Sequence, residues 1–231
     1  MKQLKILALG LLVSTAFISC DILSIHPLAN RDELIFDEAI VGNWFEDIDD
    51  LTKEGMQTHA EHFDNKDSAY SILSQPAKYV FEKHNLGSYS YYDIYKTTRE
   101  IRDGEIIEVT SAYELKLTEI DGVKWASIRI GDNSDFSNSR RIGAHTFLVR
   151  ANGFAKVNIN ENSIELRFLS YEWFKAVISK NRMKIDYELV GSDASPQIVL
   201  TANTEQLRNL MARIDDVDEA FEDEAVILNR K

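Results

Sequence analysis

Two histidines with helical spacing form the sharpest polar cluster of this chain. His59 and His62 stand three residues apart, with Glu54, Glu61 and Asp64 close by. On a helix such a pair lies on one side and could bind zinc together with a carboxylate. The spacing is not the His-Glu-x-x-His arrangement of metalloproteases. Because the segment is polar and acidic, we expect two solvated histidines, with a weak metal site as the alternative.

Motifs for catalysis are few. The sequence has no Gly-x-Ser-x-Gly elbow for a nucleophilic serine. Glu82, Glu108 and Glu165 could supply the paired carboxylates of a glycoside hydrolase, but a chain with 38 acidic residues offers such pairs by number alone. Phosphate-loop, dinucleotide-binding and nucleic-acid-binding signatures are absent from the sequence. We therefore predict a protein that is not an enzyme and uses no cofactor.

Tyrosines concentrate in one predicted strand. Side chains alternate between the two faces of a strand, so Tyr89, Tyr91 and Tyr95 share one face and Tyr92 and Ile94 the other. Pockets for small ligands favour aromatic walls with a few polar tips, which makes Tyr89, Tyr91 and Tyr95 candidate ligand-binding residues. Ordinary packing is the alternative, because tyrosine is common in half-buried strands.

The single cysteine, Cys20, follows a leader with the features of an export signal. Lys2 and Lys5 are followed by apolar and small residues at 6–18, a stretch shorter than the roughly 20 residues that span a bilayer. Residues 17–20, Phe-Ile-Ser-Cys, resemble the lipobox of bacterial lipoproteins, whose cysteine takes a diacylglyceryl group and becomes the new N-terminus. We interpret residues 1–19 as a lipoprotein signal peptide and Cys20 as the lipid attachment site.

The charge of the chain restricts its partners. A formal net charge of −12 at pH 7 repels phosphate backbones and anionic headgroups, so we expect no nucleic-acid partner and no basic face that docks on membranes. Contact with the membrane must then come from the lipid on Cys20. With that thiol modified no disulfide can form, and the hydrophobic core alone must stabilise the exported domain.

Hydrophobic periodicity predicts a mainly β fold. Alternating runs predict strands at 40–45, 69–73, 78–84, 89–95, 113–120, 123–130, 145–151, 156–159, 163–168, 183–189 and 197–202. Asp121-Gly122 fits a two-residue type I′ turn, which pairs Leu117 with Ala126 and places Thr118 and Trp125 on a mostly solvated face.

Two helices are predicted. One begins after Ser170 and buries Trp173 and Phe174, and the other begins at Asn203, which forms a capping box with Gln206. Strands that follow one another through short turns favour a sheet that closes. The prediction is an antiparallel lipocalin-like β-barrel of about 8–10 strands with two short helices. Residues 20–37 form a lipidated tether and residues 38–231 the barrel domain.

Two features resemble known proteins. Gly42 and Trp44 match the Gly-x-Trp first strand of lipocalin-like barrels, in which the tryptophan closes one end. Residues 145–148, 166–175 with Trp173, and 199–207 resemble, in order and spacing, a group of poorly characterised bacterial lipoproteins with a lipocalin-like barrel. The resemblance implies a fold and a cell-envelope location, and no chemistry is established for the group. Gly42, Trp44 and Trp173 are its structural signature.

We hypothesise a membrane-anchored envelope lipoprotein with a non-catalytic lipocalin-like barrel that binds a small hydrophobic or amphipathic ligand. A protein–protein interaction or structural envelope module without ligand is the alternative, and a hydrolase or metal-binding protein comes third. Asp21 after the cysteine favours inner-membrane retention under the enterobacterial rule. Lipoproteins resembling this one often follow other rules, so we predict the outer membrane.

Overall fold

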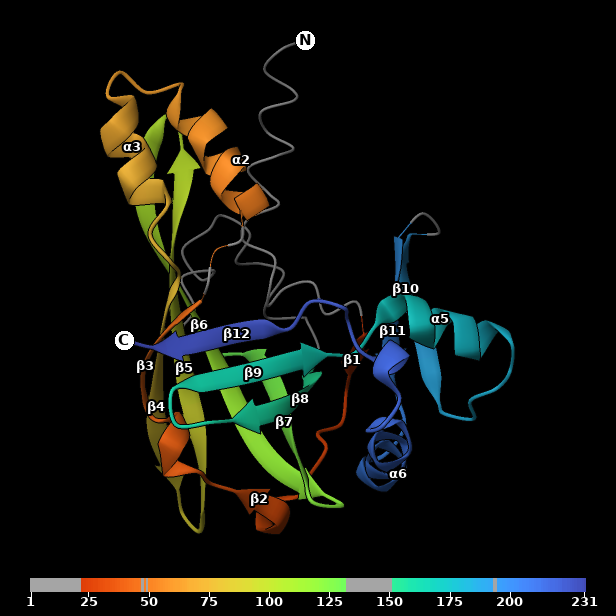
Figure 1. The fold of residues 1–231 in the computed structure, drawn as a ribbon. Coiled ribbons are helices and arrows are strands. Elements are labelled where there is room, and N and C mark those ends of the chain that lie inside the picture. The colour runs from red at the N-terminus through yellow and green to blue at the C-terminus, as the bar shows by residue number, and fades with distance from the viewer. Residues whose placement is uncertain (1–21, 47, 49, 132–150, 193–194) are drawn as a thin grey trace.

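The sheet of this protein closes on itself. The structure is a computed structural model that describes residues 22–131 and 151–231, apart from 47, 49, 193 and 194. Eight antiparallel strands form a closed barrel, as predicted (Figure 1). They are β3 (Gly42–Glu46), β4 (Lys78–Leu86), β5 (Tyr89–Arg102), β6 (Glu105–Ile120), β7 (Val123–Ile130), β8 (Gly153–Ile159), β9 (Ser163–Phe168) and β12 (Val226–Arg230). Neighbours in sequence are neighbours in the barrel until β9, and β12 closes it between β9 and β3.

The remaining elements lie around the barrel. The strands are β1 (Ile22–Ser24), β10 (Tyr187–Ser192) and β11 (Ser195–Leu200), which form a separate sheet, and β2 (Leu34–Ile35), which pairs with β6. The helices are α2 (Asp50–Ala60), α3 (Lys66–Leu73), α5 (Tyr171–Ser179), α6 (Thr204–Ile214) and the short 3-10 turns η1 (Arg31–Glu33), η2 (Glu38–Ile40) and η4 (Asp218–Ala220).

Several predicted elements are corrected by the structure. The described residues contain four α-helices rather than two. Residues 69–73, predicted as a strand, belong to α3, because their apolar side chains pack against α2 in a small separate core. The predicted strands at 183–189 and 197–202 correspond to β10 and β11, which lie outside the barrel. The predicted strand at 145–151 falls almost entirely outside the described residues.

The β6–β7 hairpin has the predicted register. Asp121 and Gly122 have φ values of 52° and 83°, as a type I′ turn requires, and Leu117 pairs with Ala126. The prediction of a solvated outer face is wrong, because Thr118 and Trp125 are 1% and 0% exposed. A second layer of structure packs against this part of the barrel wall. The sequence of the hairpin alone does not indicate that another part of the chain packs on its outer face.

The second layer forms its own hydrophobic core. Outward side chains such as Trp125 and Phe154 pack there against α5, α6 and the β1–β11–β10 sheet, which Figure 1 shows beside one wall of the barrel. Residues from Ile22 onward take part. Leu28 is fully buried, and its backbone N–H lies 3.3 Å from Ser127 Oγ. The described part of the predicted tether is therefore packed against the domain.

Large side chains occupy the barrel interior. Trp44, Tyr79, Phe81, Tyr92 and Ile94 are each 0–1% exposed and belong to one continuous cluster. The cluster is completed by Ile40, Tyr113, Leu115, Leu117, Ala126, Ile128, Ala155, Val157, Ile164, Leu166, Phe168 and Leu228. Eight strands enclose just enough space for side chains or for one small ligand. Here the described side chains themselves use that space.

Trp44 and Arg230 pack against each other across the β3–β12 pair. The indole Nε1 of Trp44 donates a hydrogen bond to Ile40 O at 2.7 Å, and the Arg230 guanidinium carbon lies 4.5 Å from the indole centroid. Arg230 also donates to Ala39 O at 2.7 Å. Gly42, the first residue of β3, has φ 136°, a conformation that residues with side chains rarely adopt. The cation on the tryptophan was not identified from the sequence.

The β5–β6 hairpin extends beyond the barrel. α2 and α3 lie beside its far end, and Ile106 packs against Ala60, Ala69 and Leu73 in the small third core (Figure 1). Within the described part of the chain, no helix combines the length and apolar character needed to cross a membrane.

Replacing Arg230 by Leu should destabilise the protein by about 1–2 kcal/mol, because the cation–π contact and the hydrogen bonds to Ala39 O and Val41 O are lost. Urea unfolding followed by tryptophan fluorescence measures the change. Arg182→Leu is the matched control, since Arg182 is exposed and should leave stability unchanged. Equal stability of both variants would show that the Arg230 contacts contribute nothing to closure.

Stability should fall as the pH rises above about 10, the ordinary pKa of tyrosine. Burial raises the pKa of Tyr92, so the folded chain keeps a proton that the unfolded chain releases. Tyr79, also buried, has its pKa raised in the same direction. The stabilisation is complete below the unfolded pKa and is lost as pH rises toward the folded one.

Tyr92→Phe should therefore reduce the slope of unfolding free energy against pH in the alkaline range. It should also cost about 1–3 kcal/mol at neutral pH, because the Asp37 N–H loses the Tyr92 hydroxyl 2.7 Å away. Urea unfolding across the alkaline range tests both effects. Tyr171→Phe, on a partly exposed residue of α5, should keep the wild-type slope. An unchanged slope in Tyr92→Phe would contradict the assignment.

Candidate functional site

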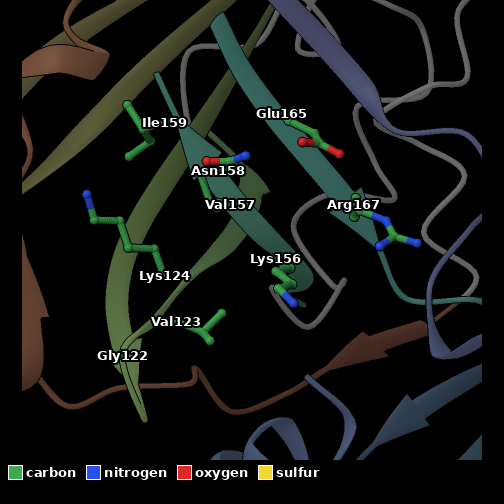
Figure 2. A pocket seen from close by; sticks show the side chains of 9 residues that line it. All are labelled: Gly122, Val123, Lys124, Lys156, Val157, Asn158, Ile159, Glu165 and Arg167. Atoms are coloured by element: carbon green, nitrogen blue, oxygen red, sulfur yellow. The ribbon is translucent and has the colours of Figure 1, made fainter. Parts of the chain in front are cut away.

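A groove of about 430 Å³ lies between the β6–β7 turn, β7, β8 and β9, and it is open to solvent (Figure 2). Its side chains come from three neighbouring strands and the β6–β7 turn. They are Gly122, Val123, Lys124, Lys156, Val157, Asn158, Ile159, Glu165 and Arg167. The volume falls within the roughly 300–1,000 Å³ range of small-molecule sites.

Strand divergence creates the groove. β7 and β8 pair as far as Lys124 with Val157, and the register ends there. β8 stays paired with β9 as far as Ile159 with Ile164. The tip of the β6–β7 hairpin therefore separates from β8, and backbone and side chains on both sides of the gap line an open space.

Three cations and one carboxylate line the groove. Lys124, Lys156 and Arg167 are the cations and Glu165 is the acid, although the chain as a whole has a net charge of −12. Val123 and Ile159 are partly exposed and supply apolar surface, whereas Val157 is buried in the interior cluster of the barrel. The groove therefore combines positive charge with a small apolar wall.

The loop after α6 positions two of these cations. Lys156 Nζ donates to Asp215 O at 2.7 Å, and Arg167 Nη1 lies 3.2 Å from Asp218 Oδ1. Both cations also lie near the buried ring of Phe221, at 5.7 and 5.1 Å from its centroid. An ammonium has three donors and a guanidinium five, so each group keeps hydrogen-bonding capacity for a ligand.

Lys124 is held by a carboxylate from the segment before the barrel. Its Nζ lies 2.6 Å from Asp37 Oδ2, and the two side chains are 33% and 26% exposed. The hydrogen bond from Lys124 is the largest effect on Asp37 and, with the backbone N–H of Ala39, keeps its pKa below the ordinary value. Asp37 therefore stays ionised near neutral pH, and its charge offsets that of Lys124, while Arg167 is paired with Asp218.

The tyrosine candidates lie outside the barrel. Tyr89, Tyr91 and Tyr95 are partly exposed on the outer face of β5, whereas Tyr92 and Ile94 point inward. The alternation of the strand was predicted, but the sequence does not show which of the two faces is internal. Tyr91 and Tyr95 line a second, smaller groove of about 170 Å³ with His84, Asp93 and Glu114.

The structure also places the other sequence candidates. His59 is partly exposed on α2, and exposed His62 follows it, with Nδ1 3.1 Å from Thr58 O. In the described ranges no group of three His, Cys, Asp or Glu side chains is arranged to hold a metal ion. Trp173 is partly buried on α5 and meets Phe174 edge to face at 5.3 Å. Cys20 lies outside the described residues.

Sequence reasoning missed the cations of the β7–β9 groove. Lys156 alternates with Val157 as in any amphipathic strand, and Arg167 does the same beside Leu166. Their meeting depends on where β7 and β8 stop pairing and on the loop after α6. Neither feature has a local pattern in the sequence.

No protein-family model, curated protein or solved structure matches this chain.

Proposed function

We propose that this protein is a lipid-anchored, non-catalytic binding protein of the cell envelope. Its ligand is a small amphipathic molecule with an anionic group, bound in the β7–β9 groove. The observation that carries the proposal is a groove with three cations and two partly exposed aliphatic side chains, Val123 and Ile159, on an acidic protein.

The packed interior supports an external site. The described inward side chains form one cluster that includes Trp44, Tyr79 and Tyr92, so a ligand inside the barrel would have to displace large aromatic groups. Overpacking a filled core costs about 1–3 kcal/mol or more. A ligand in the groove avoids that cost, and its carboxylate or phosphate can meet Lys156 and Arg167 while its apolar part covers Val123.

Protein–protein interaction is the second candidate function. Leu189 and Val190 on β10 are 60% and 50% exposed, and β10 is the last strand of its sheet. Exposed edge strands pair readily with other chains. A partner that binds there would leave the β7–β9 groove open to its ligand.

The ligand proposal is tested with a fragment that starts at Asp21 and so contains every described element. After incubation with envelope extract and gentle purification, native mass spectrometry should show a reproducible added mass. We expect Lys156→Ala/Arg167→Ala to lose it, because both direct contacts to the anion disappear. Lys180→Ala is the matched control, since Lys180 is exposed after α5, away from the groove.

The result can overturn the proposal in two ways. An added mass that persists in the double variant would place the ligand elsewhere. No added mass with the wild-type fragment would remove the small-molecule proposal and favour the protein-interaction function.

The anchor proposal is that Cys20 carries the lipid and that the protein resides in the outer membrane. Cys20→Ser should abolish incorporation of radiolabelled fatty acid, because a hydroxyl is not a substrate for thioether formation. Density-gradient fractionation of the wild-type chain should place it with outer-membrane markers. Ser14→Ala, in the same leader, should leave labelling unchanged. Labelling that survives Cys20→Ser would refute the attachment site.

A further inference from the structure

We propose that the β1–β11–β10 sheet lies directly on the membrane, with Leu189 and Val190 of β10 entering the layer between lipid headgroups and acyl chains. The inference rests on the proposed lipid at Cys20 and extends it from an attachment point to an orientation of the whole domain. It also assigns the exposed strand β10 to a lipid surface rather than to a protein partner.

The chain is fixed to the domain almost immediately after Cys20. Ile22 is 3% exposed and Ser24 is fully buried. Ser24 N donates to Asn152 O at 2.8 Å, and Ser24 Oγ donates to Leu200 O at 3.3 Å, so β1 is joined both to the residue before β8 and to β11. Two residues of extended chain reach at most about 7 Å. A lipid on Cys20 therefore holds the surface of the bilayer close to the first residue of β1.

Strand pairing places Leu189 beside this point. Ile22 pairs with Ile198 and Ile198 pairs with Leu189, so the three residues form one row across the sheet. Neighbouring strands lie about 4.8 Å apart, which puts Leu189 about 10 Å from Ile22. β11 is parallel to β1 and antiparallel to β10, so β10 runs toward the end of the sheet from which the chain enters β1. Val190 follows Leu189 and lies nearer that end.

Leu189 and Val190 are apolar side chains that the protein leaves in water. They are 60% and 50% exposed, although Leu189 shares a face with the buried Ile198. β10 is the last strand of its sheet, so within the described residues one row of its backbone polar groups is unpaired. These groups need water or headgroups, which keeps the strand in the interfacial layer while its side chains reach the acyl chains. The exposed Glu188 lies one residue further from the anchored end and stays in water.

The stretch that leads into β10 differs in charge from the rest of the chain. Residues 173–185 contain no acidic residue and four exposed cations, Lys175, Lys180, Arg182 and Lys184. Met183 and Ile185 of this stretch pack in the second core together with Ile198, so the cations lie beside the sheet. The net charge of −12 predicted no basic face, and this stretch is a local exception. Its attraction to anionic headgroups, effective within about 8–10 Å, offsets repulsion from the acidic remainder.

The test uses the fact that Cys20 is the only cysteine of the chain. Once Cys20 carries its lipid, a cysteine introduced elsewhere is the one reactive thiol. Leu189→Cys is expressed with the native leader, purified as the lipid-modified chain, labelled with the environment-sensitive dye NBD and reconstituted into vesicles of phosphatidylethanolamine and phosphatidylglycerol. The emission should shift to shorter wavelength and should be quenched by lipids that carry a doxyl group near the headgroup, because the dye has left water. Val190→Cys provides an independent second variant.

Leu86→Cys is the matched control. Leu86 is also apolar and 50% exposed, but it ends β4 in the turn before β5, outside the β1–β11–β10 sheet. A dye at this position should keep the emission of a probe in water and should not be quenched. Circular dichroism of each labelled chain confirms that it is folded.

The outcomes separate failure of this inference from failure of the anchor. If the chain floats with the vesicles in a density gradient but the probes at Leu189 and Val190 behave like the probe at Leu86, the anchor stands and the membrane contact is refuted. β10 is then free for the protein-interaction function. If the wild-type chain does not float and its Cys20 reacts with the dye, the thiol carries no lipid, and both the anchor and this inference are wrong.

Discussion

Backbone pairing of β12 with both β9 and β3 converts an open meander into a barrel. Leu228 pairs with Ile164 on one side and with Glu46 on the other, and its side chain is fully buried in the interior. Closure removes the two sheet edges that would otherwise pair with other chains. The same strand brings Arg230 over Trp44, so the pairing that closes the wall also forms this cation–π contact.

This closure determines where the rest of the chain lies. Between β9 and β12 the chain leaves the barrel, forms α5, the β10–β11 hairpin and α6, and then returns. The excursion buries its apolar faces against the outer wall, and β1 joins it from the N-terminal side. The result is one core inside the barrel and a second core outside, with Trp125 in the second although its strand neighbour Ala126 is in the first.

The filled interior leaves the open polar regions of the described residues on the outer surface. The interior holds large aromatic side chains, and the buried Lys96 lies 3.4 Å from the partly buried Glu46. Burial lowers the pKa of Lys96, and Glu46 opposes that shift. On the outside, the second layer covers part of the wall and leaves two polar regions open. One depends on the loop after α6 for the placement of Lys156 and Arg167, and the other depends only on the alternation of β4, β5 and β6.

The sequence by itself determined the features with local physical causes. The Asp121-Gly122 turn fixed the β6–β7 register because a two-residue loop pairs Ile120 with Val123, and the Asn203 capping box fixed the start of α6. Alternation separated Tyr91 from Tyr92, and the Gly42 and Trp44 signature indicated the barrel.

Tertiary structure decided what depends on distant contacts. Residues 69–73 became helical because they pack on α2, and the short apolar run that forms β12 gained its role only from two distant strands. Closure of the barrel decides which tyrosines face inward. The second layer decides that Trp125 is buried, and the loop after α6 decides which cations meet in the groove. Those contacts join residues far apart in the chain, and no local pattern encodes them.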